Sequence, residues 1–191
     1  MPRAGLSTAA VVGAAAELAD AEGLEALTLA RLAGSVGVRT PSLYNHVASL
    51  DDVRRRVALV GLRELGDAMR DATVGRAGDD ALTAMAHAYR AYAHAHPGRY
   101  AAMQRAPAAG DDELATPAAR AVDVLLAVLR GYGLEGDDAI HAARAVRSAL
   151  HGFVALESGG GFGIPVALDE SFDRMVAALA RGLGEPRATS R

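Results

Sequence analysis

Apolar positions recur along this chain with the three- and four-residue spacing of helices that bury one face. The first such segment covers about residues 7–22, and Gly23 follows it as a stop signal. Val11, Ala15 and Leu18 share one face of this segment. Segments of the same kind continue to the C-terminal region, and no alternating strand pattern competes with them. The pattern predicts an all-α protein of about nine helices.

Capping residues and glycines indicate where the later helices begin and end. The expected helices cover about residues 29–36, 40–47, 50–71, 79–96, 99–104, 117 to 131 or 133, 137 or 138 to 157, and 171–182. Thr28 caps the first of these, and Ser49 with Asp52 forms a capping box before the long helix. Thr116 is the expected cap of the helix that has Pro117 in its first turn. Residues 106–114 and 159–163 are expected to be loops.

Residues 29–47 have the pattern of a helix-turn-helix. Such a motif crosses two short helices over a tight turn, and Ala33 and Gly37 supply the small residue at the crossing and the left-handed residue in the turn. The expected small core consists of Leu32, Val36, Val38 and Leu43. The second helix then keeps a polar outer surface, which suits the major groove of DNA. A small helical hairpin without DNA binding has the same features, so the pattern leaves both interpretations open.

One run of residues favours the DNA-binding interpretation. The run Pro41-Ser42-Leu43-Tyr44-Asn45-His46-Val47 follows Gly37 and precedes the capped long helix. Together with Leu32-Ala33 and Leu27-Thr28, it resembles the DNA-binding domain of the tetracycline-repressor (TetR) family, over about residues 6–65. The resemblance implies a three-helix DNA-binding domain over residues 1–50, linked by the long helix 49–71. A ligand-binding and dimerisation domain over residues 72–191 is expected to follow.

The resemblance also implies which side chains face DNA. They are Thr28, Arg39, Thr40, Ser42, Tyr44, Asn45, His46 and Ser49. Asn45 has the amide that suits an adenine edge, whereas Tyr44 and His46 are expected to bond phosphates. The alternative for Tyr44 is that its ring packs against the first helix, from which its hydroxyl can still reach out. Arg39 stands where the family usually has a small polar residue, and we expect it to contact a base or a phosphate. Thr28 and Ser49 lie at helix N-termini, which favour phosphate.

The charge distribution limits how strongly one subunit can bind DNA. The formal net charge is −3, and residues 1–60 contain six arginines and six acidic residues. Leu50 stands where many relatives carry a lysine, which removes one expected phosphate contact. Arg54, Arg55 and Arg56 diverge by about 100° each on a helix, and we expect them to be solvated surface. Affinity is therefore expected to depend on dimerisation.

Residues 79–183 resemble a regulatory domain of the same family that carries a Trp-x-x-x-His-Gly signature. Its counterpart here begins at Arg147, which replaces the tryptophan, and ends with His151-Gly152. In the family the last two helices pair across a two-fold axis. The expected dimer interface consists of Ala149, Gly152, Leu156, Phe172, Met175, Val176 and Leu179. The alternative is that these helices pack only within one subunit.

Mixed apolar and polar residues in the C-terminal half are candidates for an effector pocket. They are Met85, Tyr89, Tyr92, Met103, His151 and Phe153. Methionine adapts to irregular shapes and tyrosine offers a hydroxyl, which suits a small, mostly apolar effector. A stripe of this kind is also typical of plain core. His87, His94 and His96 do not have the spacing of a shared metal site, so we expect no metal and no cofactor.

Composition excludes several other classes of protein. The chain has no cysteine, which excludes disulfides and thiolate chemistry. No apolar stretch approaches the roughly 20 residues of a membrane span, so a cytoplasmic protein without membrane contact is expected. No phosphate loop or paired carboxylates point to an enzyme. The sequence therefore predicts a ligand-responsive transcriptional repressor that binds operator DNA as a homodimer. The alternative is a helical dimer that acts through protein partners.

Overall fold

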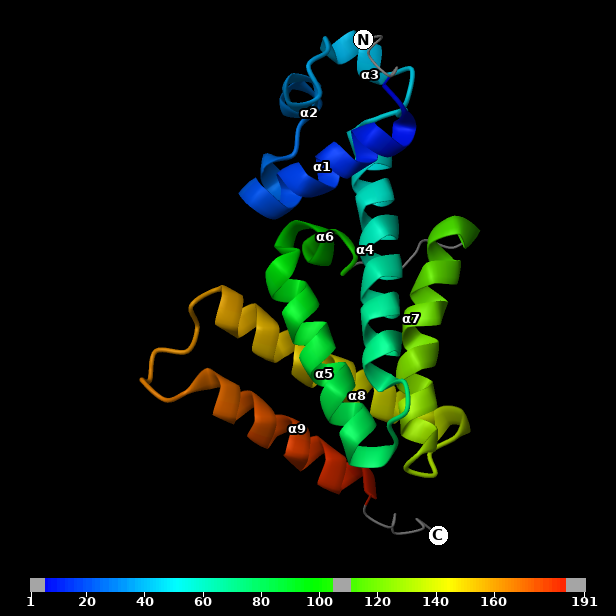
Figure 1. The fold of residues 1–191 in the computed structure, drawn as a ribbon, viewed down its shortest axis with the longest axis vertical. Coiled ribbons are helices and arrows are strands. Elements are labelled where there is room, and N and C mark those ends of the chain that lie inside the picture. Colours follow the sequence, from blue (N-terminus) through cyan, green and yellow to red (C-terminus); the bar gives the residue numbers. More distant parts are fainter. Residues whose placement is uncertain (1–5, 105–110, 185–191) are drawn as a thin grey trace. The chain divides into compact units, whose positions relative to one another are not determined.

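The computed structural model describes residues 6–104 and 111–184 and confirms the all-α expectation (Figure 1). Within these ranges there are nine α-helices, one 3-10 helix and no strand. The elements are α1 (Thr8–Glu22), η1 (Leu24–Ala26), α2 (Leu29–Ser35), α3 (Thr40–Leu43), α4 (Leu50–Thr73), α5 (Gly78–Ala95), α6 (Pro97–Ala102), α7 (Asp112–Arg130), α8 (Gly136–Ser158) and α9 (Leu168–Gly184). Among the described residues, no helix is both long enough and apolar enough to span a bilayer.

The chain forms two compact units. Unit 1 consists of Met1–Glu64 and Ala95–Ala118, and unit 2 consists of Leu65–His94 and Ala119–Arg191. Helix α4 contributes residues to both units. The DNA-binding domain was expected to end at residue 50. The two units are defined by compact packing and not by function, so this boundary stays a prediction.

Unit 1 has a small core made almost entirely of valine, leucine and alanine. Its buried members are Val11, Ala15, Ala16, Leu27, Leu32, Ala33, Leu43, Val47, Val53 and Val57. They come from α1, α2, α3 and the first turns of α4, and Leu27 and Val47 come from the segments between these helices, so one cluster fixes all four helices. Burial of each valine or leucine contributes roughly 1.5–3 kcal/mol. Val36 and Val38, expected in this core, are partly buried and pack against it.

Helix α6 packs closely on α1 within unit 1. A Cβ atom at Gly98 would lie 2.5 Å from the backbone nitrogen of Asp20 and closer still to the carbonyl of Ala19. Only glycine allows this approach of two backbones. Asp20 also ties the helices together, since its carboxylate accepts a 2.8 Å hydrogen bond from the backbone N–H of Arg99. Helix α6 lies in the compact unit 1, and its expected place in the ligand-binding and dimerisation domain stays a prediction.

Unit 2 is built around Phe172 and Val176 of α9, which are 0% and 1% exposed. Aliphatic and alanine residues of α5, α7 and α8 complete this core, among them Leu82, Leu129 and Val146. Figure 1 shows α8 and α9 as consecutive helices, and the loop between them contains the expected glycine cluster.

Several element boundaries differ from the expectation, most clearly in α7. Residues 106–110 lie outside the described residues, but α7 begins at Asp112 rather than after Thr116. Asp111 caps it, because its carboxylate accepts the backbone N–H of Leu114 at 3.1 Å. Pro117 therefore lies inside the helix. Helix α9 begins three residues earlier than expected, at Leu168, and α3 ends at Leu43 and continues only as turns.

Candidate functional site

The helix-turn-helix of unit 1 is held by a left-handed turn and a side-chain cap. Gly37 has φ +71°, which a residue with a Cβ adopts only with strain. The chain then folds back so that the N–H of Val38 donates to the carbonyl of Ala33 at 3.0 Å. At the start of α2, the Thr28 hydroxyl accepts the N–H of Arg31 at 3.3 Å. These local bonds fix the direction in which α3 leaves the turn.

Helix α3 and the turn after it, residues 40–47 (the α3 segment), present polar residues outward because Leu43 and Val47 are used in the core. Leu43 and Val47 are buried, whereas Tyr44 between them is 57% exposed. The end of the α3 segment is also tied to α1, since the Thr8 hydroxyl donates to the carbonyl of His46 at 3.4 Å. The buried residues fix the backbone of this segment, and its exposed side chains remain free to contact a partner.

The structure places the eight sequence-predicted DNA-facing residues along one segment of unit 1, from the start of α2 to the start of α4. Thr28, Arg39, Ser42, Tyr44, Asn45 and Ser49 are exposed, and Thr40 and His46 are half-buried. Ser49 caps α4 by accepting the N–H of Asp52 at 3.1 Å. The Asp52 carboxylate accepts the N–H of Ala48 at 2.9 Å, so the capping box closes one residue earlier than expected.

The electrostatics of this segment differ from those of the whole chain. Residues 26–50 contain two arginines and no acidic residue. Arg31 forms an ion pair with Glu22 of α1, which neutralises it. Within the described part of the chain, Arg39 has no acidic partner. The helix-turn-helix therefore carries local positive charge although the protein is net negative.

The three consecutive arginines of α4 are less exposed than expected of solvated surface, because they form ion pairs. They are half-buried and each is paired: Arg54 with Glu25 at 3.7 Å, Arg55 with Asp111 and Glu113, and Arg56 with Asp52. The Arg55 guanidinium, by hydrogen bonding, holds the pKa of Asp111 below its ordinary value. Helical spacing correctly separates the three side chains, but their acidic partners lie up to 58 residues away in sequence. These arginines are ion-paired within unit 1 and do not form a free basic patch.

An ion-pair cluster in unit 2 was missed by sequence reasoning. Arg90 of α5 makes a two-point pair with Glu157 of α8 and a 2.8 Å pair with Asp169 of α9. Its guanidinium lies over the rings of Phe153 and Phe172, at 5.6 and 4.8 Å from their centroids. The hydrogen bond from Arg90 lowers the pKa of Glu157 to about 2. No local pattern signals a pair 67 residues apart.

The effector-pocket candidates are mostly enclosed in the protein. Met85, Tyr89, Tyr92, Met103 and Phe153 are buried, and His151 is half-buried. Met103 belongs to unit 1, whereas the other five belong to unit 2. Phe153 packs on Phe172 with ring centroids 5.1 Å apart. These contacts fit both a pocket wall and plain core, so the assignment stays a prediction.

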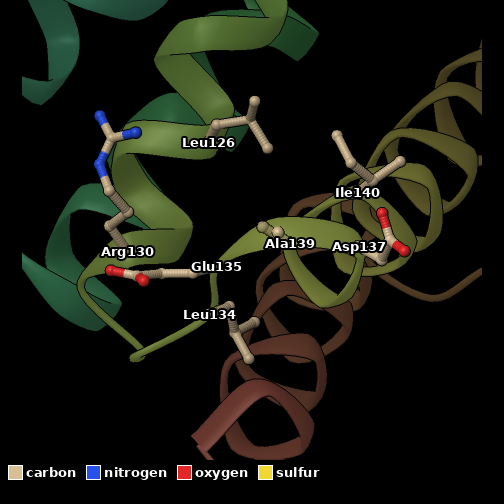
Figure 2. Close-up of a pocket in the computed structure, with 8 residues that line it drawn as sticks. Leu126, Arg130, Leu134, Glu135, Asp137, Ala139 and Ile140 are labelled. Atoms are coloured by element: carbon tan, nitrogen blue, oxygen red, sulfur yellow. The ribbon is translucent and has the colours of Figure 1, made fainter.

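A surface cavity of about 530 Å³ lies elsewhere in unit 2, where α7 ends and α8 begins (Figure 2). Leu126, Leu134 and Ile140 give it an apolar part, and Arg130, Glu135 and Asp137 bring charges of both signs to it. None of the six sequence-predicted pocket residues lines it.

The expected dimer residues divide into two groups. Phe172 and Val176 are buried within their own chain and have no surface to offer a partner. Ala149, Gly152, Met175 and Leu179 are half-buried, and Leu156 is 51% exposed. The reason for the division is packing within the chain: the Phe172 ring contacts His87 of α5 and Phe153 of α8, and Val176 is 1% exposed in the core of unit 2.

Comparison with known proteins agrees with these features. The family model of the tetracyclin repressor-like C-terminal domain matches residues 82–179. The chain is 46% identical to a helix-turn-helix-type transcriptional regulator of Mycobacterium tuberculosis, over 96% of this chain and 84% of that protein. It is 37% identical to a helix-turn-helix-type transcriptional regulator of Bacillus subtilis, over 95% of each.

A solved structure has the same fold. The structure of BioQ with its double-stranded DNA operator matches 94% of this chain and 98% of that chain with a TM-score of 0.70 and 23% identity. At this identity the likeness concerns the fold alone. The family model and the two regulators decide the assignment: the chain belongs to the tetracycline-repressor (TetR) family of helix-turn-helix transcriptional regulators.

Proposed function

We propose that this protein represses transcription by binding operator DNA as a homodimer, and that a small, mostly apolar effector releases it. The observation that carries the proposal is the segment from Thr28 to Ser49: an exposed polar surface without acidic residues, held rigidly by a buried core. A recognition helix needs this combination to enter a major groove in a fixed orientation. A protein of the same fold bound to its operator supports the same use of the fold.

Within this proposal the polar side chains divide into two roles. Tyr44 and His46 bond phosphates and fix the register, as do the hydroxyls of Thr28 and Ser49, each of which keeps its own hydrogen as a donor after capping. Asn45 faces base edges, where its amide matches adenine.

Two subunits are needed because one such surface makes few contacts. The proposed interface consists of the half-buried and exposed residues of α8 and α9, namely Ala149, Gly152, Leu156, Met175 and Leu179. Binding to successive major grooves requires the two recognition helices to lie about 34 Å apart, one turn of DNA, or at a related spacing.

Effector release follows as a population shift. The effector site is proposed among Met85, Tyr89, Tyr92, His151 and Phe153. An effector bound there favours one arrangement of the dimer only by its difference in affinity for the two arrangements. A compound that binds tightly and leaves the affinity for DNA unchanged contradicts this mechanism.

The testing experiment measures binding of the purified protein to its own upstream intergenic DNA and to scrambled DNA at several salt concentrations. Tight, selective binding that is abolished in Tyr44→Ala and Asn45→Ala supports the proposal. Thr83→Ala is the matched control, because Thr83 is an exposed polar residue on α5. Equal and weak binding to both DNAs contradicts the proposal and favours a helical dimer that acts through protein partners.

A further inference from the structure

We infer that Arg39 reads a guanine in the major groove of each operator half-site, an inference that rests on the proposed function. Arg39 is the residue immediately before α3 and has extended backbone angles, φ −83° and ψ 147°. Its side chain is exposed. In helix-turn-helix proteins the residues at the N-terminal end of the recognition helix contact base edges. Arg39 therefore stands where specific contacts are made.

The guanidinium of Arg39 is available for such a contact. Within residues 6–53, the other arginine is Arg31, which is paired with Glu22. Arg39 has no ion-pair partner among the described residues, and the chain has no acidic residue from 26 to 50 to supply one nearby. A free guanidinium presents two parallel N–H donors, which match the O6 and N7 acceptors of guanine. Neither adenine nor a pyrimidine offers this pair of acceptors.

Arg39 also occupies its position at a cost to local stability. Ser7, Thr28 and Ser49 cap their helices with side-chain oxygens in the same unit. Arg39 makes no side-chain cap to α3, although a serine at this position stabilises a helix. The Arg39 side chain makes no hydrogen bond or ion pair among the described residues that would compensate for the missing cap, and this points to a contact outside the protein.

The experiment selects binding sites from randomised double-stranded DNA with the wild-type full-length protein, Arg39→Ser and Arg63→Ala. Arg63 is the matched control: it is exposed, without an acidic partner in the described residues, and lies about 20 Å along α4 from its first residue. The wild type and the control are expected to select a two-fold symmetric motif with one required guanine per half-site. Arg39→Ser is expected to keep the rest of the motif and to show no preference at that one position.

Affinity measurements test the same interaction directly. Arg39→Ser is expected to weaken binding to the selected site by about 5- to 150-fold for each guanine that is no longer bound, while its melting temperature stays equal or rises because serine caps α3. Replacing the required guanine by 7-deazaguanine, which lacks the N7 acceptor, is expected to weaken the wild type and leave Arg39→Ser unchanged.

Three results overturn the inference. If Arg39→Ser selects the wild-type motif with unchanged affinity, Arg39 does not touch the DNA. If it keeps the motif but binds all sequences more weakly, with a smaller salt dependence that Arg39→Lys restores, Arg39 binds phosphate. If the wild type selects no motif, the proposed function fails together with the inference. If the wild type selects a motif and only the results for Arg39 disagree, the inference alone fails.

Discussion

Replacement of Gly98 by alanine tests how unit 1 holds α6 against α1. The added Cβ would lie 2.5 Å from the backbone nitrogen of Asp20, whereas real Cβ contacts are essentially never shorter than 3.0 Å. The opposing atoms are backbone, so no side-chain rotation relieves the overlap and the two helices must separate. Overpacking of this kind costs about 3 kcal/mol, the upper end of its usual range. Separation also weakens the hydrogen bond from the Arg99 N–H to Asp20, now 2.8 Å.

The assay is thermal and urea-induced unfolding followed by circular dichroism. A decrease of about 3 kcal/mol in the free energy of unfolding lowers the melting temperature of a chain of this size by about 6–12 °C. The matched control is Gly13→Ala in α1, where an added Cβ meets nothing within 4 Å. It is expected to stabilise the protein by about 0.5–1 kcal/mol through helix propensity. A Gly98→Ala protein within about 0.5 kcal/mol of the wild type refutes the reasoning.

Three further changes have expected outcomes. Because the pKa of Glu157 is lowered to about 2, its pair with Arg90 stabilises the fold above the ordinary carboxyl pKa, and this stability is lost as pH falls from about 4.5 towards 2. Glu157→Gln is expected to cost about 2 kcal/mol at pH 7 and to flatten this part of the pH profile of unfolding; an unchanged profile contradicts the assignment. Thr28→Ala removes the cap of α2 and is expected to lower the free energy of unfolding in urea by about 1 kcal/mol. An unchanged urea midpoint would show that this hydrogen bond does not stabilise the protein. Gly152→Leu is expected to keep the helical circular dichroism of the chain, since the position of an added Cβ is open within one chain, but to shift light scattering from dimer to monomer. A Gly152→Leu protein that stays dimeric removes Gly152 from the proposed interface.

The sequence by itself determined the all-helical class, the approximate place of most helices and the helix-turn-helix, because these depend on interactions between residues close in the chain. Thr28 caps the helix that follows it directly, and Gly37 supplies the left-handed turn four residues after Ala33. The exposure of Tyr44 next to the buried Leu43 follows from helical spacing alone. In such cases the spacing of residue types fixes the local geometry, and little else competes with it.

Only the tertiary structure decided which residues meet across long separations. Arg55 is half-buried beside Asp111, and Arg90 is held by Glu157 between two aromatic rings, although neither partner is near in sequence. Phe172 belongs to the core of unit 2 rather than to a free apolar face, since a helix's periodicity shows that a face is apolar but not what covers it. Charge pairing and burial are properties of the packed chain, because each depends on atoms that folding brings together from distant segments.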